Sequence, residues 1–325
     1  MSAFPRPPSS YPARSDATRP AINPSRPAAG RSHPSARRSA DDRGKPSFDA
    51  DFRFPDRTVA LPTGVPADAR SVYGIHAVTE LLRSASSPIF ALCVSESSSP
   101  ATSAALASLL RIAQEQGVEP IMRSRGELDR LTRGAVHQGV VAFCSAFRYH
   151  SDVHGILRAA GNEPPLVVIL DGVTDPQNLG ALVRSTYVLG GHGVVLPMNN
   201  SAQVTAATAK AAAGATEVLP IAQVANLLRT LRDLKDREVQ LLAAVAPGQG
   251  GQPAWDCDLS RPTAILLGSE GKGLRPQVRK SCDGRIEVPM QAGLHGASLN
   301  VSAAGAVLLY EALRQRRKQA AIDHG

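Results

Sequence analysis

Apolar residues form short, unbroken runs in the second half of the chain, and longer segments of helical character separate them. The runs are Leu166–Leu170, Val194–Leu196, Val218–Leu219, Leu241–Val245, Ala264–Leu267 and Ile286–Val288. Strands that are apolar on both faces are typical of a parallel sheet covered by helices on both sides. A last helix is expected from about Leu299 to Arg316, whose apolar positions share one face. The pattern predicts an α/β domain over residues 164–317.

A smaller α/β pattern comes before this domain, over residues 70–147. Helical apolar spacing begins at Ile75, and an Ala- and Leu-rich helix is expected from Thr102 to Gln116. Short strands are expected at Ile89–Val94, Val118–Met122 and Val140–Phe143. The sequence therefore predicts two domains, which residues 148–163 join as a linker, and a basic C-terminal tail over residues 318–325.

Proline and charge set the first part of the chain apart. Residues 1–57 contain 10 prolines and no periodic apolar pattern, and we expect residues 1–69 to form a disordered basic tail. The net charge of the chain is +8, and residues 1–57 carry 11 Lys and Arg against 6 Asp and Glu. Such a tail attracts polyanions without reading their sequence. A tail that only improves solubility is an equally good interpretation.

The cysteines and the lengths of the apolar runs limit the class of protein. Four cysteines, Cys93, Cys144, Cys257 and Cys282, lie far apart and form no C-x-x-C pair. This spacing disfavours a zinc site, and we expect no metal and buried free thiols in a reducing compartment. No apolar run approaches the roughly 20 residues that a membrane helix needs. We therefore expect a soluble, cytoplasmic protein with no membrane partner.

Three polar, glycine-rich blocks each follow or contain the end of a strand-like run. They are L-D-G-V-T-D-P-Q-N-L-G-A-L-V-R (170–184), L-L-G-S-E-G-K-G-L (266–274) and V-P-M…A-S-L-N-V-S-A-A (288–304). In an open α/β sheet, ligands bind beyond the carboxyl ends of the strands. The three blocks therefore predict one pocket assembled from distant parts of the chain.

Each block has residue types that suit an anion or a close backbone approach. Asp175 and Pro176 form a typical helix start, and Arg184 is able to fork onto a phosphate or carboxylate. Taken alone, this block is equally explained by a local cap and a solvated arginine. The glycines of the second block allow sharp turns, but they fit neither the Walker nor the G-x-G-x-x-G spacing. Ser298 is a plausible cap for the last helix, whereas capping does not require Asn300 as well.

Together the blocks resemble the SpoU family of the SPOUT superfamily, the RNA ribose 2′-O-methyltransferases that use S-adenosylmethionine. The resemblance covers about residues 70–315. The segments G-I-H-A-V (74–78), G-A-V-H-Q-G-V-V-A (134–142) and D-G-V-T-D-P-Q-N-L-G-A (171–181) are most similar to members that methylate a guanosine ribose in 23S ribosomal RNA. The resemblance implies a trefoil-knotted methyltransferase domain and an RNA substrate-binding domain similar to kink-turn-binding ribosomal proteins. It also implies a homodimer whose active site uses both subunits.

The resemblance further implies roles for individual residues. The positions that contact S-adenosylmethionine, largely through backbone groups, are Gly268, Val288 and Leu299. The catalytic and RNA-facing polar set comprises Asn178, Arg184, Glu270, Ser298 and Asn300. Arg184 is the position proposed to activate the ribose hydroxyl. Because a guanidinium stays protonated, we expect Arg184 to hold the target phosphate and stabilise the developing 2′-alkoxide, with Ser298 binding or relaying the proton.

The segment before Ser298 departs from the family pattern. Two residues are inserted, one on each side of Gly293, in the loop expected to wrap the cofactor. The same loop contains His295, which we interpret as an ordinary loop histidine rather than a base.

Two alternative functions stay open at this point. One is the same chemistry on transfer RNA, which the separate domain over residues 70–147 disfavours. The other is an RNA-binding module without catalysis, which the intact polar set disfavours.

Overall fold

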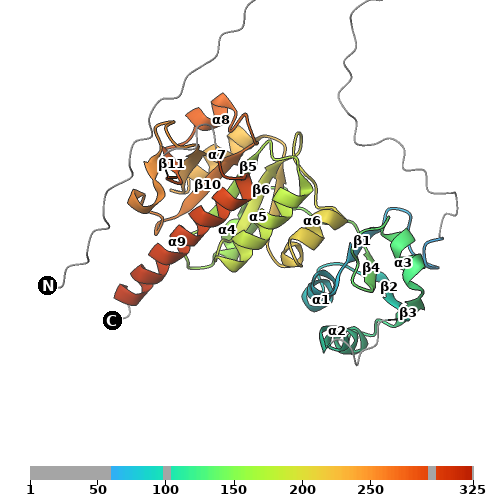
Figure 1. Cartoon of the computed structure of the whole chain (residues 1–325). Helices are drawn as coiled ribbons and strands as arrows, with labels where there is room; N and C mark the ends of the chain where they lie inside the picture. The colour runs from blue at the N-terminus through green and yellow to red at the C-terminus, as the bar shows by residue number, and fades with distance from the viewer. Residues whose placement is uncertain (1–59, 98–103, 292–297, 324–325) are drawn as a thin grey trace, which may run out of the picture. The chain divides into compact units, whose positions relative to one another are not determined.

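The computed structural model describes residues 60–97, 104–291 and 298–323 (Figure 1). Most of the predicted N-terminal tail lies outside the described residues, and so do Gly293 and His295 of the inserted loop. No helix in the described ranges is long and apolar enough to cross a membrane. All four cysteines are free, and burial raises the pKa of the Cys282 thiol to about 11.

The larger domain contains a parallel sheet, as the apolar runs predicted, and this sheet has seven strands. Its strands are β5 (Leu166–Asp171), β6 (Gly193–Pro197), β7 (Ile221–Val224), β8 (Gln240–Val245), β9 (Gln252–Pro253), β10 (Thr263–Gly268) and β11 (Gly284–Glu287). The strand order is β7-β6-β5-β10-β8-β11-β9. Strand β10 thus lies between β5 and β8, so segments about a hundred residues apart pair directly. Strand order does not describe how the backbone threads through itself, so the trefoil knot stays a prediction.

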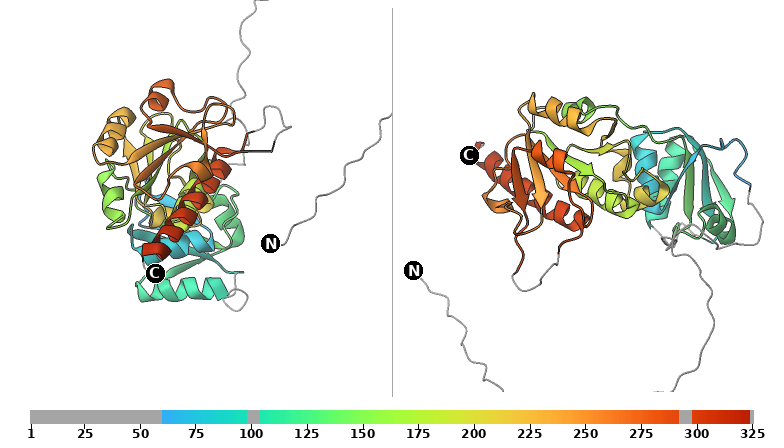
Figure 2. Two further views of the ribbon diagram at one scale, coloured as in Figure 1. Left: turned by 90° about the vertical axis from the view of Figure 1, so that its left-hand side faces the viewer. Right: turned by 90° about the horizontal axis from the view of Figure 1, so that it is seen from above.

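Helices cover both faces of this sheet, and Figure 2 shows them from two further sides. They are α4 (His154–Ala159), α5 (Pro176–Val188), α6 (Ala206–Ala211), α7 (Leu227–Lys235), α8 (Pro276–Lys280) and α9 (Val301–Asp323). Successive residues of β5 face opposite sides. Leu166, Val168 and Leu170 pack into the core beneath α5 and α9, while Val167 and Ile169 pack into the core beneath α4 and α7. The uninterrupted apolar run therefore reflects two separate cores.

Helix α5 starts where its sequence predicts. The Asp175 carboxylate accepts a hydrogen bond from Gln177 N at 3.0 Å, and Pro176 occupies the first turn. Helix α9 crosses α5 closely (Figure 1), since a Cβ on Gly305 would collide with the side chain of Leu182. Burying α5 under α9 in this way sets the position of both helix starts at the C-terminal edge of the sheet.

The smaller domain has a four-stranded sheet of order β1-β4-β2-β3. Its strands are β1 (Arg70–Tyr73), β2 (Ile89–Ser95), β3 (Pro120–Arg123) and β4 (Val140–Cys144), and its helices are α1 (Ile75–Ser84), α2 (Ala104–Glu115) and α3 (Arg125–Leu131). Strand β1 and helix α3 were missing from the sequence prediction. Helix α3 has a capping box, in which Ser124 and Glu127 each bond the other's backbone, and this signal was present in the sequence.

A buried ion pair connects β1 to the 3₁₀ helix η2 (Ala215–Glu217) of the larger domain. The two terminal nitrogens of Arg70 donate to the Glu217 carboxylate at 2.8 and 3.0 Å. The side chains are only 7% and 1% exposed, and Ser86 Oγ also donates to Glu217. A charge pair removed from water to this degree depends on both partners being present.

His192 forms a partly buried polar contact, just before β6. Its Nδ1 accepts a hydrogen bond from Leu166 N at 2.9 Å, and its Nε2 lies 3.4 Å from the carboxylate of Glu163. Burial is the main cause that lowers the pKa of His192, and the exposed Glu163 opposes it in part. The neutral imidazole is thus the form that fits the fold.

The predicted linker over residues 148–163 differs from the observed structure. His150 pairs with β7, where its N donates to Ile221 O at 2.9 Å, and α4 follows at His154. Val153 and Ile156 are buried in the core of the larger domain. A helix of only six residues has too few turns to show a periodic pattern, which is why composition alone suggested a linker.

Three other element boundaries were wrong. The expected strand at Val218–Leu219 is absent, because η2 ends just before it and β7 begins at Ile221, after Pro220. Helix α9 continues to Asp323, so the expected C-terminal tail is largely helical. This helix is capped by Asn300 and not by Ser298, since Asn300 Oδ1 accepts from Ser302 N at 2.9 Å.

Candidate functional site

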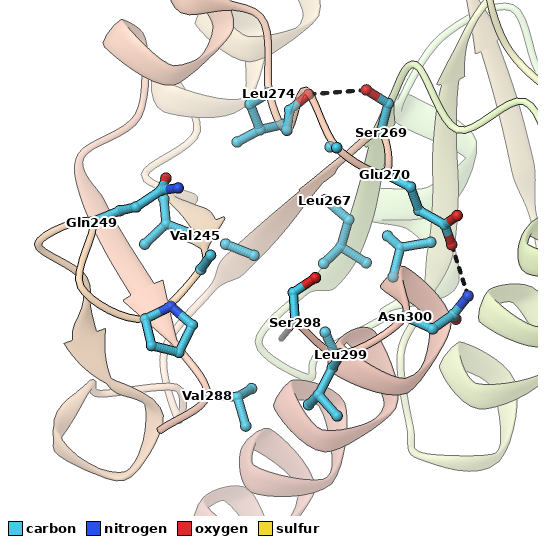
Figure 3. A pocket seen from close by; sticks show the side chains of 18 of the residues that line it. Val245, Gln249, Leu267, Ser269, Glu270, Leu274, Val288, Ser298, Leu299 and Asn300 are labelled. Carbon is cyan, nitrogen blue, oxygen red and sulfur yellow. Dashed lines mark hydrogen bonds between the residues drawn. The ribbon is translucent and has the colours of Figure 1, made fainter. Parts of the chain in front are cut away.

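A cavity of about 520 Å³ opens at the carboxyl ends of β8, β10 and β11 (Figure 3). Its walls come from residues within 244–249, 267–274, 286–290 and 298–308, together with Arg279. The second and third polar blocks therefore form one pocket, as predicted. The first block does not line this cavity. Its place is taken by the end of β8 and the residues just after it, within 244–249, which the prediction did not assign to the pocket.

A tight glycine-rich loop closes one side of the cavity. Ser269 N donates to Gly273 O at 3.2 Å, and Gly273 N donates to Ser269 O at 2.8 Å. Gly271 and Gly273 have φ values of +80° and +65°, which favour glycine. Gly268 is needed for another reason: a Cβ there would lie 2.6 Å from Gly273 O. The loop folds back on Gly268 so closely that no side chain fits.

The three residues expected at the cofactor all line the cavity. They are Gly268, Val288 and Leu299. The side chains of Val288 and Leu299 lie on the wall opposite the loop (Figure 3), and Leu267 and Ile286 supply apolar surface at the strand ends. A pocket of this size, with apolar walls and a backbone loop, is typical of sites for small organic ligands.

Three residues of the predicted polar set meet at one edge of the cavity. Asn178 Nδ2 donates to Glu270 Oε1 at 3.0 Å, and Asn300 Nδ2 donates to the same oxygen at 2.7 Å. Asn300 Nδ2 also lies 3.0 Å from Asn178 Oδ1, to which it donates. The three side chains come from three different blocks, so the first block reaches the site through Asn178.

The network fixes the orientation of its members. Asn178 is buried, and Asn300 uses its Oδ1 to cap α9 while its amide nitrogen holds Glu270. A carboxylate that accepts two amide hydrogen bonds is held in one position. Glu270 thus places a negative charge at the mouth of the cavity, where Ser298 also lies (Figure 3).

Arg184 is the predicted catalytic residue that the fold does not bring to the cavity of its own chain. It is exposed on α5 and lies outside the cavity lining. Within residues 60–97, 104–291 and 298–323 it has no hydrogen-bond or ion-pair partner. Tyr187 and Val188, three and four residues later on the same helix face, are 49% and 62% exposed.

One segment of the cavity was not predicted from the sequence, although that segment has the same pattern as the predicted blocks. The segment A-P-G-Q-G-G (246–251) comes directly after the apolar run of β8, as the other blocks come after theirs. It lacks a charged residue, which is why it did not stand out. No group of three or more potential metal ligands occurs in the part of the chain that the structure describes.

Comparisons with known proteins identify the family. Residues 165–310 match the model of the SpoU rRNA Methylase family, and residues 71–150 match the model for RNA 2′-O ribose methyltransferase substrate binding. A relative from Shewanella oneidensis, named 23S rRNA (guanosine-2′-O-)-methyltransferase RlmB, is 38% identical over 248 residues, which are 76% of this chain and 97% of the relative. The chain belongs to the SpoU family. It is an RNA methyltransferase, and this family uses S-adenosylmethionine.

Other similar proteins agree with this family. An uncharacterized tRNA/rRNA methyltransferase from Mycobacterium tuberculosis is 37% identical over 77% of this chain and 76% of its own length. The crystal structure of the SpoU methyltransferase AviRb from Streptomyces viridochromogenes has a TM-score of 0.63 and 26% identity, covering 78% of this chain and 91% of AviRb. The match spans the α/β architecture, including the smaller N-terminal domain.

Proposed function

We propose that this SpoU methyltransferase methylates the ribose 2′-oxygen of a guanosine in 23S ribosomal RNA. The observation that carries the proposal is the match to the Shewanella relative, which extends over 97% of that protein and includes both domains. The substrate-binding region at residues 71–150 belongs to this match. A shared substrate domain favours a shared substrate class, because that domain contacts RNA away from the reaction centre.

The cavity fits S-adenosylmethionine by its own features. The glycine-rich loop from Gly268 presents backbone rather than bulky side chains to the cavity, and Val288 and Leu299 offer apolar surface to an adenine ring. When bound, the cofactor would supply a methyl group on a positively charged sulfur: the ribose 2′-oxygen would bond to the methyl carbon as the carbon–sulfur bond breaks, so that a neutral thioether leaves and the hydroxyl proton is released. Glu270, held by Asn178 and Asn300, orients the polar edge at which the ribose would lie.

We propose further that the protein is a homodimer and that Arg184 acts in the partner's site. Support comes from exposed apolar residues on two touching helices, Tyr187 and Val188 on α5 and Val307 and Tyr310 on α9. The α9 residues are 44% and 60% exposed, which is unusual for a surface that stays in water. Arg184 lies beside these residues on α5, so pairing two copies would carry it toward a second cavity.

Mixing two inactive variants tests the cofactor site and the shared site together. Arg184→Ala should abolish methyl transfer to 23S RNA while S-adenosylmethionine binding, measured by calorimetry, persists. Arg184→Lys should not restore activity, because an ammonium lacks the planar fork. Gly268→Val should lose cofactor binding, while this variant still has its native Arg184.

The mixture decides whether Arg184 acts across the dimer. Randomly exchanged subunits of a two-fold dimer give about half hybrids. Each hybrid would have one complete site if Arg184 acts across the interface, so about a quarter of wild-type activity should return. A mixture without activity, or a monomer in sedimentation at micromolar concentration, would contradict the shared site. Wild-type protein that binds no S-adenosylmethionine would contradict the enzyme itself.

A further inference from the structure

A second cavity of about 220 Å³ lies at the carboxyl ends of β5, β6 and β10. The strand order places it on the other side of the β10 loop from the first cavity, and Ser269 and Lys272–Leu274 line both. Its remaining walls include Asp171 at the end of β5 and Asn199 and Asn200 after β6. The residues expected at the cofactor, Gly268, Val288 and Leu299, are not part of its lining.

Two cationic side chains of this cavity, Arg275 and Lys272, have N–H groups that are available to bind a ligand. Asp171 is 2% exposed and accepts from Arg275 N at 2.9 Å and from Arg275 Nε at 2.7 Å. These bonds hold the arginine side chain in place, and the hydrogen bonds of the described chain leave its two terminal nitrogens available. Lys272 has no carboxylate partner among the residues that the structure describes.

The lining therefore combines a fixed guanidinium, an ammonium and two exposed amides. Its one carboxylate, Asp171, is already committed to Arg275. Guanidinium and ammonium groups are the side chains that hold phosphate oxygens most strongly, and amides add further donors. A neutral base would leave two cations without a counter-charge, so the chemistry favours an anion with several oxygens.

We propose that this cavity binds a backbone phosphate of the substrate RNA beside the nucleotide that is methylated. The inference rests on the proposed function and names a subsite for its substrate. Lys272 is two residues from Glu270 in the same loop, and Glu270 belongs to the network with Asn178 at the reaction edge. One loop would then separate the cofactor from the phosphate and position the ribose between them.

The main test places a negative charge in the cavity without disturbing the fold. Asn199 is exposed, so Asn199→Asp should fold normally and repel a phosphate. Asn162→Asp is the matched control, since it makes the same change at an exposed position outside both cavities. We measure S-adenosylmethionine binding by calorimetry, and the KM and kcat for an unmodified 23S RNA transcript.

The expected result is a change in RNA recognition alone. Asn199→Asp should raise the KM for RNA about tenfold, and leave cofactor affinity and the control unchanged. Arg275→Gln, which keeps the backbone bond to Asp171, should lower the slope of log affinity against log salt by about 0.7 to 0.9, the loss of one phosphate contact. Lys280→Gln, at a position outside both cavities, should change that slope by less than Arg275→Gln does.

The outcomes separate this proposal from the proposed function. If wild-type protein methylates the transcript but Asn199→Asp matches its control in KM, the phosphate subsite is wrong. If Asn199→Asp weakens cofactor binding as much as RNA binding, the second cavity belongs to the cofactor site and the proposal is also wrong. Wild-type protein without methyl transfer would contradict the proposed function instead.

Discussion

Replacing Gly268 with alanine should disrupt the loop that forms the cofactor cavity. The added Cβ would lie 2.6 Å from Gly273 O, and nearer still to the Gly273 carbonyl carbon and to Leu274 N. Ordinary van der Waals contact begins at 3.4 Å, so these atoms must separate by about 0.8 Å or more. All three obstacles are backbone atoms, which cannot rotate aside. The segment from Ser269 to Leu274 must therefore move as a unit.

The displacement sets the size of the effect. Overpacking a well-packed site costs about 1–3 kcal/mol, and a shift of about 1 Å near a reaction centre is able to reduce its rate about 100-fold. We expect Gly268→Ala to melt at a slightly lower temperature and to bind S-adenosylmethionine about ten- to 100-fold more weakly. The larger effect should appear in binding, because the displaced segment lines the cavity directly.

Calorimetric titration with S-adenosylmethionine, together with thermal melting, measures both effects. Gly126→Ala is the matched control, because a Cβ at Gly126 meets nothing within 4 Å and its helix α3 is remote from the cavity. This control should bind the cofactor like wild type. If Gly268→Ala also binds within twofold of wild type and melts normally, the close backbone approach does not shape the cofactor site.

Three further predictions concern buried polar groups. Arg70→Ala should lower the free energy of unfolding in urea by about 3–5 kcal/mol, because Glu217 would remain buried without its partner, and the pair Arg70→Met with Glu217→Met should recover most of this loss. Burial lowers the pKa of His192, so the free energy of unfolding should be constant above about pH 7 and decrease as the pH falls below about 6.5, the unfolded-state pKa. Urea denaturation at pH 7.5 and 5.5 checks this, and His192→Asn, which keeps an acceptor for Leu166 N, should reduce the difference in unfolding free energy between the two pH values. Asn178→Ala should slow methyl transfer in the RNA assay while cofactor affinity is kept, since Asn178 does not itself line the cavity and its two bonds orient Glu270 and Asn300 at the polar edge.

The sequence alone predicted the elements whose cause is local. The central strands β5, β6 and β10 were found because they are buried on both faces, and the start of α5 was found because Asp175 and Pro176 favour it directly. The meeting of polar blocks at one edge also followed from the sequence, since parallel strands present their carboxyl ends together. Helix α4 was missed because six residues show no period, and its burial comes from contacts with β6 and β7.

Tertiary structure decided which of the predicted residues work together. Asn178, Glu270 and Asn300 meet because β10 inserts beside β5 and α9 packs across α5, and no local pattern encodes either contact. The same packing turns Arg184 outward, away from the cavity of its own chain, which no local pattern decides. Local periodicity is a property of neighbours in sequence, whereas strand order and helix crossing depend on side chains over a hundred residues apart. The residue types at the site were therefore readable from the sequence, and their geometry was settled only by the packing of the whole domain.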